Sequence, residues 1–186
     1  MKKFGWKTLS SKVVYKNPWI SVRHDSIVYP GGRKGIYGVV QKGPGVAVAA
    51  VNDAGRIYLV KQYRYTLDDV FYELPAGAIH KGESALASAK RELWEEIGLK
   101  ADRWKRLGNF YTALGHENAE IIVYLAKGLK HPKASNLNQQ HDESILEISE
   151  LSQAELKRMI RSNRIHCGIT LAALNLFFTV SANESK

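Results

Sequence analysis

Three glutamates near the middle of the chain have the types and spacing needed for metal chemistry: Glu92, Glu95 and Glu96. Successive residues of an α-helix are turned by about 100°, so the three carboxylates share one stripe if this segment is helical. Like charges at this spacing weaken a helix by about 0.2–0.5 kcal/mol per pair. A hard divalent cation removes that repulsion, and Mg²⁺ typically binds carboxylate oxygens together with substrate phosphates. The stripe therefore indicates a magnesium site that acts on a phosphorylated compound.

The same stripe also has an ordinary interpretation as the charged face of a helix. Arg91 and Glu95 have the i,i+4 spacing of a surface ion pair. Small residues on the carboxylate side favour the functional interpretation, because they would leave room for a diphosphate; they are Ala85, Ser88 and Ala89.

A helix over residues 84–97 is predicted to hold the glutamates. The segment contains good helix formers and no proline, and Gly98 stands where a left-handed cap is expected. Leu86, Leu93 and Ile97 form a neighbouring apolar stripe, which we expect to pack on a sheet.

The chain before this helix is predicted to form strands joined by turns. Apolar runs bounded by Pro, Gly and Asn indicate strands at residues 13–15, 19–24, 36–40, 46–51, 57–60 and 70–74. The runs 46–51 and 57–60 are separated by an Asn-Asp-Ala-Gly turn, which predicts that they pair as a hairpin.

The chain after this helix is predicted to combine two strands with two helices. The strands are expected at residues 104–111 and 120–126, and the polar stretch 130–142 is typical of a mobile loop. Ser152 and Glu155 have the spacing of a capping box, which predicts a helix to residue 162; a last helix is expected at 170–179. The predicted architecture is α+β, a mixed sheet with helices packed on it.

Composition places the chain among soluble globular proteins. It has 186 residues, of which 45% are hydrophobic and 24% charged, and no run is long enough for a membrane span. A single cysteine, Cys167, and the lack of an apolar stretch behind the first lysines favour a cytoplasmic protein without a secretory signal.

The net charge of +9 is concentrated at one end of the chain. Residues 1–42 hold nine basic side chains and one acid, Asp25. This excess either attracts a phosphorylated ligand or simply covers a solvated surface. Nucleic acid is not an expected partner, because no arginine-rich block, zinc signature or RNA-binding aromatic motif is present.

The segment leading into the glutamate helix carries a specific resemblance. Gly77, Glu83 and the run from Arg91 to Leu99 fill every defined position of the pattern G-x5-E-x7-R-E-U-x-E-E-x-G-U, where U is apolar. The chain therefore resembles the Nudix hydrolases. The resemblance implies their α/β/α sandwich, Mg²⁺ with Mn²⁺ as an alternative, Glu92 and Glu96 as principal metal ligands, Glu95 as a further catalytic ligand, and Arg91 orienting the glutamates while paired with Glu83.

Two runs outside this pattern resemble the ADP-ribose pyrophosphatase branch of the family. They are residues 61–64, Lys-Gln-Tyr-Arg, and residues 73–77, Glu-Leu-Pro-Ala-Gly. This resemblance implies that the carbonyl of Ala76 is a metal ligand and that Arg64 and Glu73 help to hold the nucleotide. For Arg64, an exposed strand arginine is the plain alternative.

The same branch implies two candidates for the general base that acts on metal-bound water. Residues 142–145, Asp-Glu-Ser-Ile, resemble a segment that supplies a mobile glutamate, here Glu143, and Glu120 is the second candidate. Glu120 ends a loop that includes Gly115, a candidate substrate contact. Either glutamate is equally well read as an ordinary surface residue.

Members of this branch are typically homodimers with active sites shared between chains, which implies an N-terminal dimerisation subdomain at 1–42 and a Nudix domain at 43–186. Trp6, Trp19 and Tyr37 fit interface anchors, base-stacking residues or plain core.

The expected function is hydrolysis of ADP-ribose or a related nucleoside diphosphate sugar, such as GDP-mannose or ADP-glucose, to a nucleoside monophosphate and a sugar phosphate. One alternative is a hydrolase of nucleoside triphosphates or dinucleotide polyphosphates, which the runs 62–64 and 73–77 disfavour. A second is a non-catalytic domain that binds nucleotide or RNA, which the intact set of box glutamates disfavours.

Overall fold

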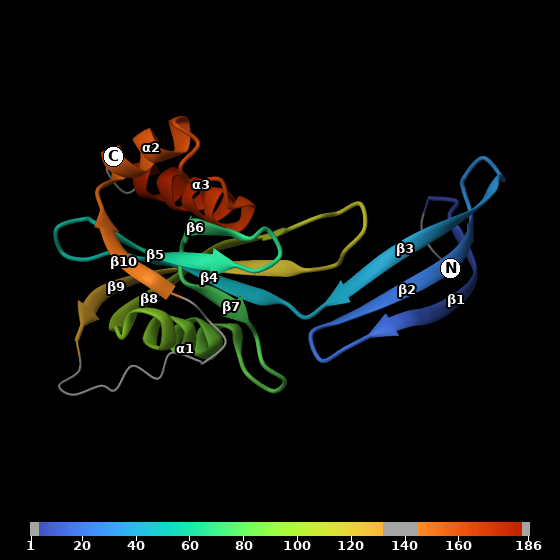
Figure 1. The fold of residues 1–186 in the computed structure, drawn as a ribbon, viewed down its shortest axis with the longest axis horizontal. Helices are drawn as coiled ribbons and strands as arrows, with labels where there is room; N and C mark the ends of the chain where they lie inside the picture. The colour runs from blue at the N-terminus through green and yellow to red at the C-terminus, as the bar shows by residue number, and fades with distance from the viewer. Residues whose placement is uncertain (1–3, 132–144, 184–186) are drawn as a thin grey trace. The chain divides into compact units, whose positions relative to one another are not determined.

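The structure is a computed structural model and describes residues 4–131 and 145–183. Within these ranges it has ten strands and three helices (Figure 1). In chain order they are β1 (Lys7–Lys16), β2 (Ile20–Val28), β3 (Lys34–Lys42), β4 (Gly45–Ala50), β5 (Ile57–Arg64), β6 (Asp69–Glu73), β7 (Ala76–Ala78), α1 (Ala85–Ile97), β8 (Lys100–Tyr111), β9 (Glu120–Lys130), β10 (Ile145–Leu151), α2 (Gln153–Arg161) and α3 (Gly168–Asn183).

The chain divides into two compact units. Unit 1 comprises Met1–Pro44 with Tyr111–Glu120, and unit 2 comprises Gly45–Phe110 with Ile121–Lys186. The boundary predicted after residue 42 did not include the segment Tyr111–Glu120, and a dimerisation role for residues 1–42 stays a prediction.

Unit 1 is an antiparallel sheet in the order β1-β2-β3, with the segment Tyr111–Glu120 bound to β3. The Val40 amide donates to the His116 carbonyl at 2.7 Å, and the Lys42 amide donates to the Asn118 side chain at 2.9 Å. These bonds satisfy backbone groups on the outer edge of β3, and so they join a loop from the middle of the chain to the N-terminal strands.

Unit 2 contains two sheets, in the orders β7-β4-β9-β8 and β10-β5-β6. Figure 1 shows α1 on one side of these sheets and α2 and α3 on the other. Two core clusters follow this division: one contains α1 residues with the even-numbered side chains of β4, and the other contains α2 and α3 residues with the odd-numbered ones. The arrangement confirms the predicted α/β/α sandwich.

The glutamate helix forms where it was predicted. The Ser84 side chain accepts from the Ala87 amide at the first turn, and Gly98 ends the helix in the left-handed conformation at φ 75°. Its packing stripe differs in one position. Ala89, Leu93 and Ile97 enter the core, whereas Leu86 is only half-buried.

The predicted hairpin of residues 46–51 and 57–60 is wrong. The turn between them forms, with a bridge from Val51 to Ile57, but β4 pairs with β7 and β9 while β5 pairs with β6 and β10. Every residue of β4 is buried. A strand that is apolar on both faces belongs in the middle of a sheet covered by helices on both sides, and its parallel partner comes from β9.

Other elements also differ from the prediction, and strands β1, β8 and β9 are longer than expected. The short strands β7 and β10 were not predicted, and α3 begins two residues earlier and ends four residues later than expected. The capping box is confirmed, because Ser152 and Glu155 bond to each other's backbone amides at the start of α2. Residues 132–144, which include most of the expected mobile loop, lie outside the described residues. Across the described part of the chain, no helix has both the length and the apolar character to cross a membrane.

Candidate active site

Helix α1 carries two carboxylates into the protein interior. Glu92 is 5% exposed and Glu96 is 1% exposed, while Glu95 is half-buried. Burying a carboxylate is costly unless a cation or hydrogen bonds neutralise it. The burial of Glu92 and Glu96 therefore disfavours the interpretation of this stripe as an ordinary charged surface.

Arg91 lies at the centre of the acidic side chains. Its guanidinium is 3.2 Å from Glu83 and 2.8 Å from both Glu92 and Glu95. Burial by itself lowers the pKa of Arg91, but the bonds to Glu83 and Glu95 and the charge of Glu92 outweigh it and raise that pKa. The hydrogen bond from Arg91 holds the pKa of the Glu83 carboxyl below its usual value.

The same guanidinium fastens the helix to β7. Arg91 Nη2 donates to the Ala78 carbonyl at 2.9 Å and to Ser88 Oγ at 3.0 Å, and Ser88 Oγ donates to that carbonyl at 3.1 Å. Ser88 and Ala89 are fully buried, so the small residues of this stripe do not leave room for a diphosphate as expected. They allow the helix to approach β7 and β4 closely instead.

Strand β7 brings the chain immediately before the helix against the two buried glutamates. A Cβ added to Gly77 would lie 2.0 Å from Glu92 Oε1, so a larger residue at this position would force the Glu92 carboxylate to move. The neighbouring Ala76 amide faces Glu96 Oε1 at 3.4 Å. Pairing of Ala76 and Gly77 with Ala47 and Val46 of β4 fixes this approach.

The residues gathered here fit a hard divalent cation in number of charges and in donor type. Three carboxylates, those of Glu83, Glu92 and Glu95, share the guanidinium of Arg91. The buried carboxylate of Glu96 faces the Ala76 amide, and all four candidate ligands offer oxygen atoms. In the arrangement seen, no three His, Cys, Asp or Glu side chains of the described residues surround a single point. Arg91 holds Glu92 and Glu95 toward itself, and a cation would compete with it for them.

Arg64 and Glu73 form a bidentate ion pair. They are the last residues of the neighbouring strands β5 and β6. Arg64 Nε donates to Glu73 Oε1 at 2.9 Å and Nη2 donates to Oε2 at 2.7 Å. Glu73 is buried while Arg64 is more exposed, so the acid fixes the orientation of the guanidinium. The two candidate nucleotide contacts are thus one structural group rather than separate residues.

The other candidate site residues have different surroundings. Gly115 belongs to unit 1, where its carbonyl accepts a hydrogen bond from the Tyr37 hydroxyl. Glu120 is the first residue of β9, half-buried, and also belongs to unit 1. Glu143 lies outside the described residues.

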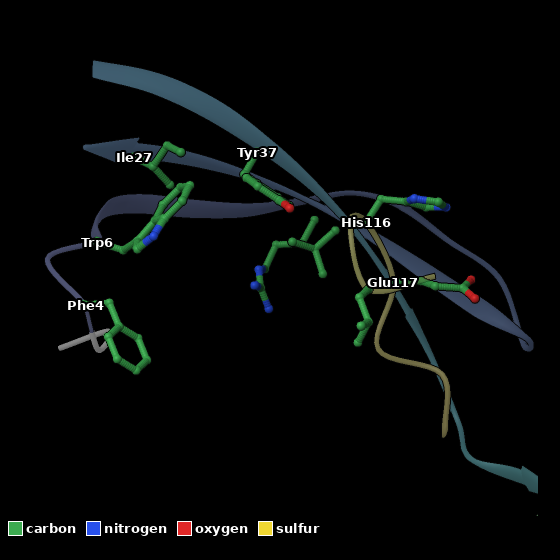
Figure 2. Close-up of a pocket in the computed structure, with 9 residues that line it drawn as sticks. Phe4, Trp6, Ile27, Tyr37, His116 and Glu117 are labelled. Atoms are coloured by element: carbon green, nitrogen blue, oxygen red, sulfur yellow. The ribbon is translucent and has the colours of Figure 1, made fainter. Parts of the chain in front are cut away.

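Unit 1 contains a pocket of about 460 Å³ that the sequence did not predict. Figure 2 shows it among side chains of the sheet, the N-terminal segment and the 111–120 loop; its lining comprises Phe4, Trp6, Arg23, Ile27, Tyr37, Val39, Leu114, His116 and Glu117.

One ion pair orders this pocket. Asp25, 1% exposed, accepts from Arg23 Nε at 2.8 Å and Nη2 at 3.0 Å, and also from the Ser11 hydroxyl. The bond to Asp25 raises the pKa of Arg23 against the opposing effect of burial. The sequence did contain a signal for this ion pair. Within a strongly basic segment, a single acid stands two residues from an arginine, and this spacing places both side chains on one face of a strand.

Comparison with known proteins gives matches along most of the chain. Residues 6–40 match the family model described as the nucleoside diphosphate sugar hydrolase N-terminal domain, and residues 41–166 match the NUDIX domain. The chain is 33% identical over 175 residues to an ADP-ribose pyrophosphatase of Mycobacterium tuberculosis, covering 94% of this chain and 84% of that protein.

Two further similarities extend over almost the whole chain. A methanol dehydrogenase activator of Bacillus methanolicus is 30% identical over 185 residues, covering 100% of this chain and 99% of the relative. A solved structure titled "Crystal structure of ADP compounds hydrolase" superimposes with a TM-score of 0.83 at 16% identity, covering 96% of this chain and 95% of that one, which shows a shared fold.

Proposed function

Because the chain belongs to the NUDIX family, we propose that it hydrolyses the diphosphate bond of ADP-ribose or a related nucleoside diphosphate sugar, giving a nucleoside monophosphate and a sugar phosphate. The observation that carries this proposal is the continuous match of residues 6–166 to the nucleoside diphosphate sugar hydrolase N-terminal domain followed by the NUDIX domain. The relative named ADP-ribose pyrophosphatase supports the same substrate class.

Nudix hydrolases depend on a divalent metal, and Mg²⁺ is the cation we propose here. Its preference for oxygen donors suits the carboxylates of Glu92, Glu95 and Glu96 and the carbonyl of Ala76. Bound there, the cation would lower the pKa of a water nucleophile and neutralise charge on the phosphates. Arg91 would orient Glu92 and Glu95 and fix β7 against the helix.

Removal of a proton from the attacking water is assigned to Glu143 or Glu120, as the sequence suggested. An ionised carboxylate at either position accepts that proton when it lies within hydrogen-bond reach of the bound water. The two assignments are distinguished by comparing Glu143→Gln with Glu120→Gln. The substitution that removes the base lowers kcat and leaves the KM of the substrate unchanged.

For the nucleotide half of the substrate, two groups are suited to recognition. Arg64, oriented by Glu73, offers a charged donor for phosphate or ribose oxygens. In unit 1, Trp6 and Tyr37 pack edge to face at 6.2 Å beside Arg23 in the pocket of Figure 2. Flat aromatic faces and a guanidinium bind a nucleobase by stacking, so we propose this pocket of unit 1, taken by itself, as a base-binding site.

A homodimer with shared active sites completes the proposal. Every residue of β1 is exposed in the single chain, and within the described residues β1 pairs with β2 alone. Its exposed apolar side chains are 51–57% accessible and comprise Leu9, Val13, Val14 and Tyr15. An edge strand with this much apolar surface favours association, and a second copy of the chain is the partner that we propose.

The substrate proposal is tested by a screen of nucleoside diphosphate sugars with Mg²⁺, in which the products are identified by chromatography. We expect turnover of ADP-ribose or a close relative to a nucleoside monophosphate. The same screen includes nucleoside triphosphates, dinucleotide polyphosphates and an RNA-binding assay. Hydrolysis of a triphosphate alone, or RNA binding without any hydrolysis, would replace the proposed function by the corresponding alternative.

A further inference from the structure

A buried hydroxyl on α3 is bonded to the chain segment that leads into the candidate active site. Thr170, the third residue of α3, is 1% exposed, and its Oγ1 accepts a hydrogen bond from the Leu74 amide at 3.0 Å. The two residues are 96 positions apart in the sequence. Both lie in unit 2.

The Leu74 amide needs such an acceptor. Strand β6 ends at Glu73, so the amide of Leu74 lies beyond the strand, and Pro75 follows it. A buried backbone amide without an acceptor is strongly disfavoured. Thr170 supplies that acceptor from a helix that contributes no other residue to the site described above.

Leu74 lies in the chain between two groups that the proposed reaction uses. On one side Glu73 orients Arg64, and two residues further on the Ala76 amide donates to Glu96 Oε1 at 3.4 Å. The next backbone hydrogen bond after Leu74 runs from the Val48 amide to the Pro75 carbonyl at 2.8 Å, and the pairing of β7 with β4 follows. The Thr170 bond therefore fixes the start of this segment, where no strand pairing holds it.

The hydroxyl of Thr170 is used differently from that of a second threonine on the same helix. Thr179 donates to the carbonyl of Asn175, four residues earlier, at 2.8 Å, which is the usual local bond of a helical threonine. Thr170 instead accepts from another element, in the interior. Valine has nearly the same shape as threonine, so packing alone does not require a hydroxyl at this position.

We propose that Thr170 is a positioning residue for the diphosphate-hydrolysing site, which it serves by holding Leu74 and thereby the Ala76 carbonyl and the Glu73 carboxylate in place. This inference rests on the proposed function and adds α3 to the elements that build the site. Thr170 is not expected to contact the substrate itself.

The test compares Thr170→Val, Thr170→Ser and Thr170→Ala with the control Thr179→Val in the full-length chain. Serine keeps the hydroxyl, whereas valine keeps the shape and removes it. We expect Thr170→Val to lower kcat for ADP-ribose and to weaken Mn²⁺ binding, measured directly by electron paramagnetic resonance, each by roughly tenfold, as for residues behind metal ligands. Thr170→Ser and Thr179→Val should stay within about twofold of wild type, below the effect expected for such residues.

Hydrogen exchange gives a readout independent of catalysis. In Thr170→Val the Leu74 amide should exchange faster, while amides in the middle of α1 stay protected. Thr170→Ala supplies the same comparison if the valine variant does not fold. A lower melting temperature with unchanged kcat and Mn²⁺ binding would show a purely structural role and overturn the inference. If wild type hydrolyses none of the sugars, the proposed function fails, while Mn²⁺ binding and Leu74 exchange still decide the role of Thr170.

Discussion

The backbone of Gly77 passes so close to the carboxylate of Glu92 that a Cβ on Gly77 would lie 2.0 Å from Glu92 Oε1. The two residues are the first and fourth defined positions of one sequence pattern. Their contact explains why that pattern begins with glycine: β7 must pass directly beside the helix that carries the glutamates.

Replacing Gly77 by alanine should therefore displace Glu92 from its place. We expect Gly77→Ala to lower turnover of ADP-ribose by about ten- to a hundredfold, as for loss of a group that orients a metal ligand. Overpacking should also reduce the free energy of unfolding by about 1–3 kcal/mol. Gly38→Ala is the control, because a Cβ there meets nothing within 4 Å. Wild-type turnover by Gly77→Ala would contradict the contact.

Glu96→Gln tests the assigned metal site without changing side-chain shape. The neutral amide is a weaker ligand for a hard cation, so we expect turnover to fall by at least about a hundredfold and Mn²⁺ binding to weaken. Circular dichroism should be unchanged. Glu147→Gln, on the exposed part of β10, should behave as wild type. If Glu96→Gln keeps wild-type activity, the assigned site is wrong.

Arg64→Lys tests the paired recognition group. Lysine keeps the charge but cannot form both parallel bonds that Arg64 makes with Glu73. We expect the KM of ADP-ribose to rise by about tenfold, the effect of losing one charged hydrogen bond, with kcat nearly unchanged. The matched change Arg56→Lys concerns an arginine bonded to Glu155 and should leave KM unaltered. An equal effect of both substitutions would argue against a specific role for Arg64.

The ion pair between Glu83 and Arg91 predicts an acid-dependent loss of stability. The folded-state pKa of Glu83 is lowered from 4.5, so its ionised form stabilises the fold above that pH, and the contribution disappears as the pH falls through the lower folded value.

The measurement is the melting temperature of wild type and Glu83→Gln in EDTA, at a series of pH values. The difference between them should be constant from pH 8 to about 5 and should narrow below about 4.5. A difference that persists unchanged to about pH 3 would mean that Glu83 does not act through its charge.

The proposed dimer is tested by placing charge on β1. Leu9→Lys combined with Val13→Lys adds two cations to an exposed apolar strand and should convert a dimer to a monomer in analytical ultracentrifugation. Tyr65→Lys combined with Leu67→Lys makes the same change at another exposed apolar position and should leave the association state as it is. A wild-type chain that sediments as a monomer would refute the dimer directly.

The sequence by itself determined the features that depend on neighbouring residues. Ser84 and Gly98 bound the α1 helix as predicted, and the spacing of its glutamates placed them on one face, because a helix is set by bonds and caps a few residues apart. The capping box of α2 was predictable for the same reason. The clustering of the carboxylates was predictable from their spacing, whereas the role of Arg91 among them was implied by the family resemblance.

Only the tertiary structure decided the relations between distant segments. It separated β4 from β5, because a strand buried on both faces takes partners from elsewhere in the chain. It joined Arg64 to Glu73 and Leu74 to Thr170. Such bonds depend on which buried polar groups need a partner once the chain has packed, and that need is invisible in a local pattern.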